Sequence, residues 1–80
     1  MLARIIHLAN EIFRFVQEER QRHGHTMFDF CDFVVRLLDW GDIGCTEDEL
    51  RVALRALVAW GAFQYFPKCG KGYVEWWGIR

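Results

Sequence analysis

The sequence predicts one α+β domain over residues 1–80, with three helices, a short strand and a C-terminal β-hairpin. Apolar residues recur at helical spacing through the first three quarters of the chain. Two aromatic runs, 62–66 and 73–79, then flank a loop that holds Pro67 and two Gly. At 80 residues the chain suits a single small domain, and its 52% hydrophobic content can fill one core.

The first predicted element is an amphipathic helix from Leu2 to about Arg22, which Gly24 ends. Its buried stripe is expected to comprise Leu2, Ile5, Ile6, Ala9, Ile12, Phe13 and Val16. Leu8 and Phe15 widen this stripe on one flank. That flank either completes the core or meets a second subunit, so a homodimer through this helix stays open.

A short strand and a second helix are predicted next. Thr26–Phe30 alternates and is aromatic, which favours a strand that pairs with the edge of the hairpin. The second helix is expected over about Asp32–Trp40, capped by Asp29 or Asp32. Its core face is expected to hold Phe33, Val34, Leu37 and Leu38, with Trp40 as a plug.

The third helix begins after Thr46, and Glu49 stands at the spacing of a capping box. Gly61 suits its C-terminus. The predicted core face consists of Leu50, Leu54, Leu57 and Val58. The opposite face then holds Asp48, Arg51, Val52, Arg55, Ala56 and Ala59.

Alternation sorts the side chains of the hairpin. If Gln64 faces water, Phe66 does too, while Phe63 and Tyr65 point inward. If Glu75 faces water, Tyr73 and Trp77 share its face, while Val74 and Trp76 point inward. Phe66, Tyr73 and Trp77 are then expected to form an exposed aromatic patch, unless the first helix or a chain terminus covers them.

Charge is distributed unevenly along the chain, although the formal net charge is only -1. Residues 26–50 hold one Arg and seven acids, whereas residues 51–80 hold five basic residues and one acid. Such a dipole can orient a protein on an anion or on a partner. The slightly acidic balance is not typical of a dedicated nucleic-acid binder.

Three cysteines without close spacing argue against a disulfide framework and a zinc knuckle, and predict reduced, mostly buried thiols. His23 and His25 could bind a metal together with Cys45 or Cys69, but nothing in the spacing requires it, and His23 is more simply a favourable partner of the helix dipole. No metal or other cofactor is therefore expected. No apolar run is long enough to span a membrane, and the N-terminus is too polar for a signal peptide. A cytoplasmic protein is therefore expected.

Catalytic motifs are absent from the sequence. It contains no Gly-rich phosphate loop, no H-E-x-x-H, no G-x-S-x-G and no Ser. A chain of 80 residues also leaves little room for a catalytic cleft beside a core. An enzyme is therefore not expected.

The predicted order of helix, strand, helix, helix and hairpin resembles the winged-helix superfamily. Its most specific segment, DELRVALRALVAWGAFQYF (48–66), is similar to the third helix and second strand of many transcriptional regulators. The segment MFDFCDF (27–33), with ALVAWGAFQYF (56–66) and a hairpin ending Trp77-Gly78-Ile79, resembles the D-protein family associated with dissimilatory sulfite reductase. That second resemblance implies an accessory protein that acts on an enzyme complex.

Two functions follow from these patterns. In the first, the domain is a transcriptional regulator that binds duplex DNA through Arg51, Arg55, Lys68 and Lys71. The acids Glu47, Asp48 and Glu49 oppose this function, because that end of a recognition helix enters the major groove first. In the second, the domain binds a partner protein through Val52, Phe66, Tyr73 and Trp77.

Overall fold

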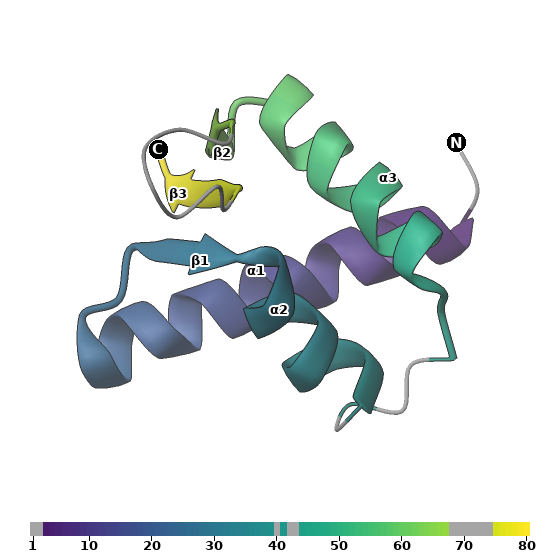
Figure 1. The fold of residues 1–80 in the computed structure, drawn as a ribbon, viewed down its shortest axis with the longest axis horizontal. Coiled ribbons are helices and arrows are strands. Elements are labelled where there is room, and N and C mark those ends of the chain that lie inside the picture. The colour runs from purple at the N-terminus through teal and green to yellow at the C-terminus, as the bar shows by residue number, and fades with distance from the viewer. Residues whose placement is uncertain (1–2, 40, 42–43, 68–74) are drawn as a thin grey trace.

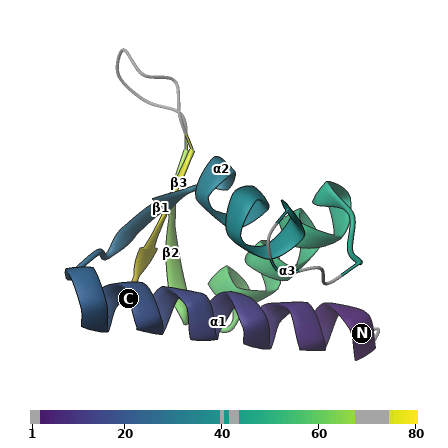
Figure 2. The ribbon, with the colours of Figure 1, turned by 90° about the horizontal axis from the view of Figure 1, so that it is seen from below.

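The computed structural model describes residues 3–39, 41, 44–67 and 75–80. Within them the chain folds as three helices and a three-stranded antiparallel sheet, which confirms the α+β class. Figure 2 shows the sheet standing over the C-terminal half of helix α1, while helices α2 and α3 cover the rest of the same side. The expected plug Trp40 and the loop residues 68–74 lie outside the described part.

The bounds of helix α1 (Ala3–His23) agree with the prediction. Its buried stripe, however, is shifted toward the flank of the helix that carries Leu8 and Phe15. Leu8 is 0% exposed and Phe15 is 7% exposed, so both belong to the core. The prediction was wrong for Ile6 and Phe13, which are 45% and 40% exposed. The helix ends as predicted at Gly24, whose φ of +70° is readily adopted by glycine.

Strand β1 (Met27–Asp29) leads directly into helix α2 (Phe30–Phe33), which continues as the π-helical segment η1 (Val34–Asp39). Asp29 is the N-cap, because its side chain accepts a hydrogen bond from the backbone N–H of Asp32 at 2.9 Å. The Asp32 carboxylate returns one to the N–H of Asp29 at 3.0 Å. The helix therefore starts two residues earlier than the expected Asp32. Phe33 and Leu37 are buried as predicted, and Val34 and Leu38 are partly buried against the core.

Helix α3 (Glu47–Ala59) packs against α1, as Figure 1 shows. The backbone N–H of Glu49 donates to Thr46 Oγ1 at 3.1 Å, and the N–H of Thr46 donates to Glu49 Oε1 at 3.0 Å, so the predicted capping box is present. At the other end Gly61 has a φ of +83°, and its N–H donates to the Val58 carbonyl at 3.0 Å. The N–H of Ala62 donates to the Leu57 carbonyl at 2.9 Å, which completes a Schellman motif.

Loss of the α3 cap is expected to be measurable. Thr46→Ala removes the acceptor for the Glu49 N–H and should lower the free energy of unfolding by about 1 kcal/mol. Thr46→Ser keeps the hydroxyl and should stay close to wild type. Urea denaturation followed by circular dichroism compares the two variants. An equal loss in both would mean that the hydroxyl does not cap the helix.

Strands β2 (Phe63–Phe66) and β3 (Trp76–Ile79) complete the sheet in the order β1-β3-β2. Strand β3 lies in the centre, so the predicted pairing of the first strand with the hairpin is confirmed. The register sets Phe28 and Tyr65 opposite Trp77 on its two sides. Side chains directly opposite one another share a face of the sheet, so these three lie on the inner face.

Aromatic side chains fill the junction between the sheet and the helices. Phe33 is 0% exposed, and its ring lies 5.9 Å from that of Phe15, 5.8 Å from that of Phe28 and 6.0 Å from that of Trp77. The contacts with Phe15 and Trp77 are edge-to-face, which aromatic quadrupoles favour. This cluster joins α1, β1, α2 and β3, and it holds the sheet in place beside the helices.

Candidate interaction surfaces

The groove between α3 and the β2–β3 pair contains two of the cations predicted from the sequence. It has a volume of about 380 Å3 and is lined by Arg51, Arg55, Val58, Ala59, Tyr65, Glu75 and Trp77. Lys68, Lys71 and Tyr73, which were predicted to act with these residues, lie outside the described part. The structure thus brings Arg51 and Arg55 together but does not describe the two lysines.

Arg51 is held by contacts with Glu75 and Phe30, although 43% of its side chain is exposed. Its guanidinium lies 3.3 Å from Glu75 Oε1, with the Glu75 side chain only 20% exposed. The same guanidinium stacks over the Phe30 ring, with its Cζ 4.1 Å from the ring centroid. Two partners from different elements therefore fix Arg51, and any external anion must compete with Glu75. Arg55 has no ion pair within the described residues.

Tyr65 completes this cluster, because its hydroxyl donates to Glu75 Oε2 at 2.5 Å. The hydrogen bond to Glu75 raises the pKa of Tyr65 above its ordinary value of 10.0. A phenol whose pKa is raised on folding stabilises the fold at pH values below its ordinary pKa. That contribution is present below about pH 10, and it is lost as the pH rises from there through the higher folded pKa.

Glu75→Gln should therefore move the pKa of Tyr65 back toward its ordinary value, because the charged acceptor is gone. An absorbance titration of the tyrosinate band in alkaline buffer measures this change, and the same titration of Tyr65→Phe assigns the signal to Tyr65 rather than Tyr73. An unchanged titration in Glu75→Gln would mean that the carboxylate does not bind the phenol in solution.

The prediction of an exposed Trp77 was wrong. Trp77 is 4% exposed, and its ring lies among those of Phe30, Phe33 and Tyr65 at centroid distances of 6.2, 6.0 and 5.4 Å. The neighbouring Trp76, predicted to be buried, is 37% exposed. The cause is Glu75, which was assumed to face water but turns inward to meet Arg51 and Tyr65. Tyr65 shares this inner face as predicted, yet at its border it is 39% exposed.

The outer face of the sheet carries an apolar patch that the alternation argument did not identify. We call Met27, Phe66 and Trp76 the sheet patch. Met27 is 42% exposed, Phe66 is half-buried, and Phe66 lies opposite Trp76 across the strands. Met27 and Phe66 close over Gly78, where an added Cβ would lie 2.8 Å from Met27 Sδ and 3.2 Å from Phe66 Cε2. Gly78 therefore permits the two side chains to approach each other.

The outward face of α3 is only partly as predicted. Val52 is 44% exposed and Ala59 is exposed. Ala56, predicted to lie on the same outward face, is only 7% exposed and cannot contribute to the apolar surface of that face. At the N-terminus of the helix Glu47 and Asp48 are exposed. Glu49 is engaged with its own cap and with Arg4, at 3.1 Å. The start of α3 is thus an acidic surface, as the sequence indicated.

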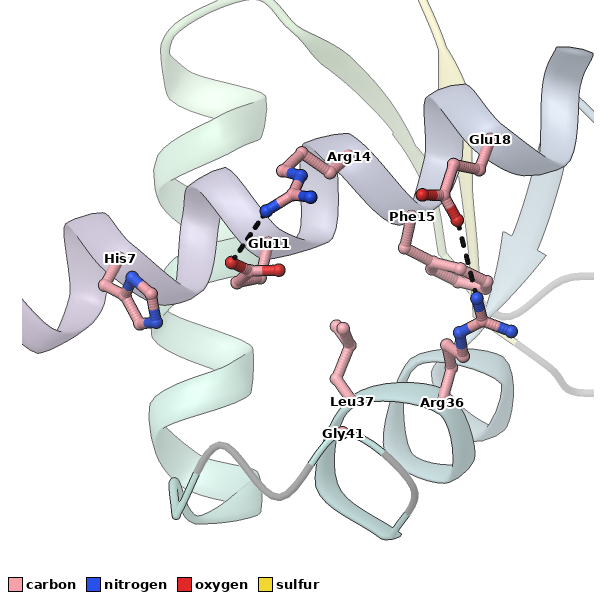
Figure 3. A pocket seen from close by; sticks show the side chains of 8 residues that line it. All are labelled: His7, Glu11, Arg14, Phe15, Glu18, Arg36, Leu37 and Gly41. Carbon is pink, nitrogen blue, oxygen red and sulfur yellow. Dashed lines mark hydrogen bonds and ion pairs between the residues drawn. The ribbon is translucent and has the colours of Figure 1, made fainter.

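A second cleft, of about 390 Å3, lies between α1 and η1 (Figure 3). Its charged side chains form two pairs, Arg14 with Glu11 and Arg36 with Glu18, each at 3.4 Å. Arg36 also lies over the Phe15 ring at 5.6 Å. Because each Arg already has a carboxylate of α1 beside it, the cleft offers little uncompensated charge to a ligand. The contacts of Arg36 with Glu18 and Phe15 tie η1 to α1.

Cysteine and histidine give no metal site in the described part of the chain. Cys31 is exposed, contrary to the expectation of mostly buried thiols, and Cys45 is partly buried. His23 lies 3.6 Å from Glu19 and its ring is 5.4 Å from that of His25. Among the described residues no cluster of three His, Cys, Asp or Glu side chains is placed to hold a metal ion.

Among the helices that the structure describes, none is long and apolar enough to cross a membrane. No family model, curated protein or solved structure matches the chain.

Proposed function

We propose that this chain is a winged-helix protein that binds a partner protein and acts as an accessory subunit of a larger complex. The element order helix, strand, helix, helix, strand, strand supports the winged-helix assignment, as does the central position of β3. The resemblance of segments 27–33 and 56–66 to a family of enzyme-associated proteins points the same way.

The observation that carries this proposal is the sheet patch. An exposed Trp beside an exposed Met and a half-buried Phe places large apolar area at the surface of a small domain. Trp is among the residues that contribute most to protein interfaces, and Met adapts to irregular apolar partners. Of the predicted set, Phe66 belongs to the sheet patch, Trp77 is buried, and Tyr73 lies outside the described residues.

The electrostatics of α3 also favour a protein over DNA. A recognition helix enters the major groove with its N-terminal residues, which here include Glu47 and Asp48. Arg51 would have to leave Glu75 and the Phe30 ring before it could contact a phosphate or a base. Both features oppose docking of this helix on a polyanion.

The test uses Trp76→Ala in affinity-tagged full-length protein produced in its native cells. Quantitative mass spectrometry should identify a defined protein complex that is retained by the wild type and lost with Trp76→Ala. Gln64→Ala is the matched control, because Gln64 is exposed on the same face of the sheet. Identical recovery of every protein by wild type and Trp76→Ala would contradict the sheet patch as the binding surface.

Binding of duplex DNA is the second candidate, and Arg55 favours it because this exposed cation of α3 has no ion pair within the described residues. With Lys68 and Lys71 it would contact the phosphate backbone. A gel-shift assay at several salt concentrations tests this function, since each phosphate contact steepens the salt dependence. Binding that weakens steeply with salt and falls in Arg55→Glu supports it, and no shift at low salt removes it.

A homodimer through α1 is also a proposal, but the contact residues differ from Leu8 and Phe15, which the sequence analysis considered. Leu8 and Phe15 are buried in the core, so the exposed Ile6 and Phe13 are the apolar side chains that α1 offers to a second copy.

A further inference from the structure

A groove at the opposite end of α3 from its acidic start combines exposed aromatic rings with two arginines that have no ion pair among the described residues. We call it the Trp60 groove. It lies between α1 and the turn that connects α3 to β2, and Arg80 also lines it. Its volume is about 350 Å3, and it is lined by Phe13, Val16, Gln17, Arg20, Trp60, Gly61, Ala62, Phe63, Ile79 and Arg80. In Figure 2 the C-terminus of the chain, marked C, is seen against the C-terminal half of α1.

Trp60 is 59% exposed, more than the other large hydrophobic side chains found exposed in the described residues. It occupies the C-cap of α3, and the Schellman turn through Gly61 and Ala62 fixes the backbone at this point. Phe13 on α1 is 40% exposed and forms the facing wall, while Phe63 forms part of the buried floor. The local backbone is thus held in place while the indole remains exposed to solvent.

The charged side chains among the described residues that line the Trp60 groove are arginines. Arg20 and Arg80 line it, both are exposed, and neither has an ion pair within the described residues. Within the part of the chain that the structure describes, no Asp or Glu lines this groove, and Gln17 is a neutral polar member. The groove between α3 and β2–β3 and the cleft of Figure 3 differ, because carboxylates line both and pair there with Arg51, Arg14 and Arg36.

We propose that the Trp60 groove binds an acidic amphipathic segment of the partner protein, an inference that rests on the proposed function and specifies the chemistry of the partner. Apolar side chains of the segment would contact Trp60 and Phe13, and its carboxylates would pair with Arg20 and Arg80. Arg–carboxylate pairs at the rim of an aromatic groove add orientation as well as binding energy.

Two other occupants fit this groove less well. A second copy would have to offer its acidic surface, the start of α3 with Glu47 and Asp48. That contact is not self-complementary and would build open chains rather than a closed dimer. A single-stranded nucleic acid requires a track of cations along its backbone, whereas the cations among the described lining of the Trp60 groove are Arg20 and Arg80.

The probe is a synthetic amphipathic peptide of about 16 residues, long enough for a helix, with Leu on one face and Glu on the other. Its control is the same peptide with Lys in place of Glu. In heteronuclear NMR titrations of the full chain, the Glu peptide should shift the indole N–H of Trp60 and the amides of Gly61 and Ala62. The Lys peptide should leave these signals unchanged.

Variants locate the interaction. Trp60→Ala should weaken binding of the Glu peptide by about tenfold or more, as expected for an interface Trp. Arg20→Glu should lose the Glu peptide and gain affinity for the Lys peptide. The matched control is Arg22→Glu, an exposed charge reversal on the same helix outside the groove. The side chains changed are exposed, and thermal unfolding checks that each variant is folded.

Several results would overturn the proposal. They are equal shifts with both peptides, shifts that avoid Trp60, tighter binding of a single-stranded oligonucleotide than of the Glu peptide, or concentration-dependent self-association that Trp60→Ala abolishes. Failure here is distinguishable from failure of the proposed function. A partner lost with Trp76→Ala but no Glu-peptide binding rejects the groove alone, and the reverse result rejects the sheet patch alone.

Discussion

Trp77→Ala should lower the free energy of unfolding by about 3–5 kcal/mol, the range for removal of a buried Trp. The indole is 4% exposed and lies against the rings of Phe30, Phe33 and Tyr65. Removing it leaves a cavity where strand β3 meets helix α2. A domain of 80 residues is typically stable by roughly 4–12 kcal/mol, so this variant should be near its unfolding transition at moderate temperature.

Trp76→Ala is the matched control, because it removes the same side chain from the next position of the same strand. Trp76 is 37% exposed, so the expected loss is about 1 kcal/mol or less. Urea denaturation should be followed by far-ultraviolet circular dichroism, since each variant also changes the tryptophan fluorescence. Equal losses in both variants would contradict the assignment of Trp77 to the inner face.

Leu54→Ala is expected to have the second largest effect, about 2–5 kcal/mol. Leu54 is 0% exposed on α3, the helix that packs along α1. Because the core of so small a domain has few layers, a cavity there cannot be filled by minor shifts of distant residues. The variant should unfold at a lower urea concentration with little change in the slope of the transition.

Val52→Ala provides the comparison on the same helix. Val52 is 44% exposed, and Ala has the higher helix propensity, so the change in stability should stay within about 0.5 kcal/mol. Were Val52→Ala to destabilise the fold as much as Leu54→Ala, the orientation of α3 would have to be different from that described.

Local signals in the sequence were sufficient to predict α3 and both of its ends. Thr46 and Glu49 form the predicted capping box, and Gly61 ends the helix with a positive φ. Each of these features depends on residues within one turn of one another, so nearest neighbours determine them. The start of the second helix shows the limit of this reasoning. Asp29 and Asp32 were both plausible caps, and in the structure they form one reciprocal pair.

The faces of the hairpin could not be assigned from alternation alone. The two-residue period correctly placed Glu75 and Trp77 on one face, but it cannot say which face is buried. The choice depended on the assumption that a carboxylate faces water. In the structure Arg51 and Tyr65, which are distant in sequence, bind the Glu75 carboxylate and allow it to face α3. The resulting inversion buries Trp77 and exposes Trp76.

The outward residues of α1 were missed for a related reason. The wide apolar stripe of α1 includes Ile6, Leu8, Phe13 and Phe15. Periodicity predicts such a stripe but does not determine which side of it is buried. The position of α3 and the sheet determines that Leu8 and Phe15 are buried. The Trp60 groove depends on this orientation of α1, because the exposed Phe13 forms part of its lining. No motif in the sequence predicts the groove.

The central position of β3 has a consequence for synthesis of the protein. Strand β3 (Trp76–Ile79) is translated after β1 and β2, yet it supplies the described hydrogen-bond partners of both. A nascent chain can form α1 and pack it against α3 before β3 is made. Until then, the backbone N–H and C=O groups of β1 and β2 lack the hydrogen bonds that β3 provides. A chain truncated before Trp76 would therefore expose apolar strands whose backbone groups have no partner strand. Chaperones and proteases recognise species of this kind.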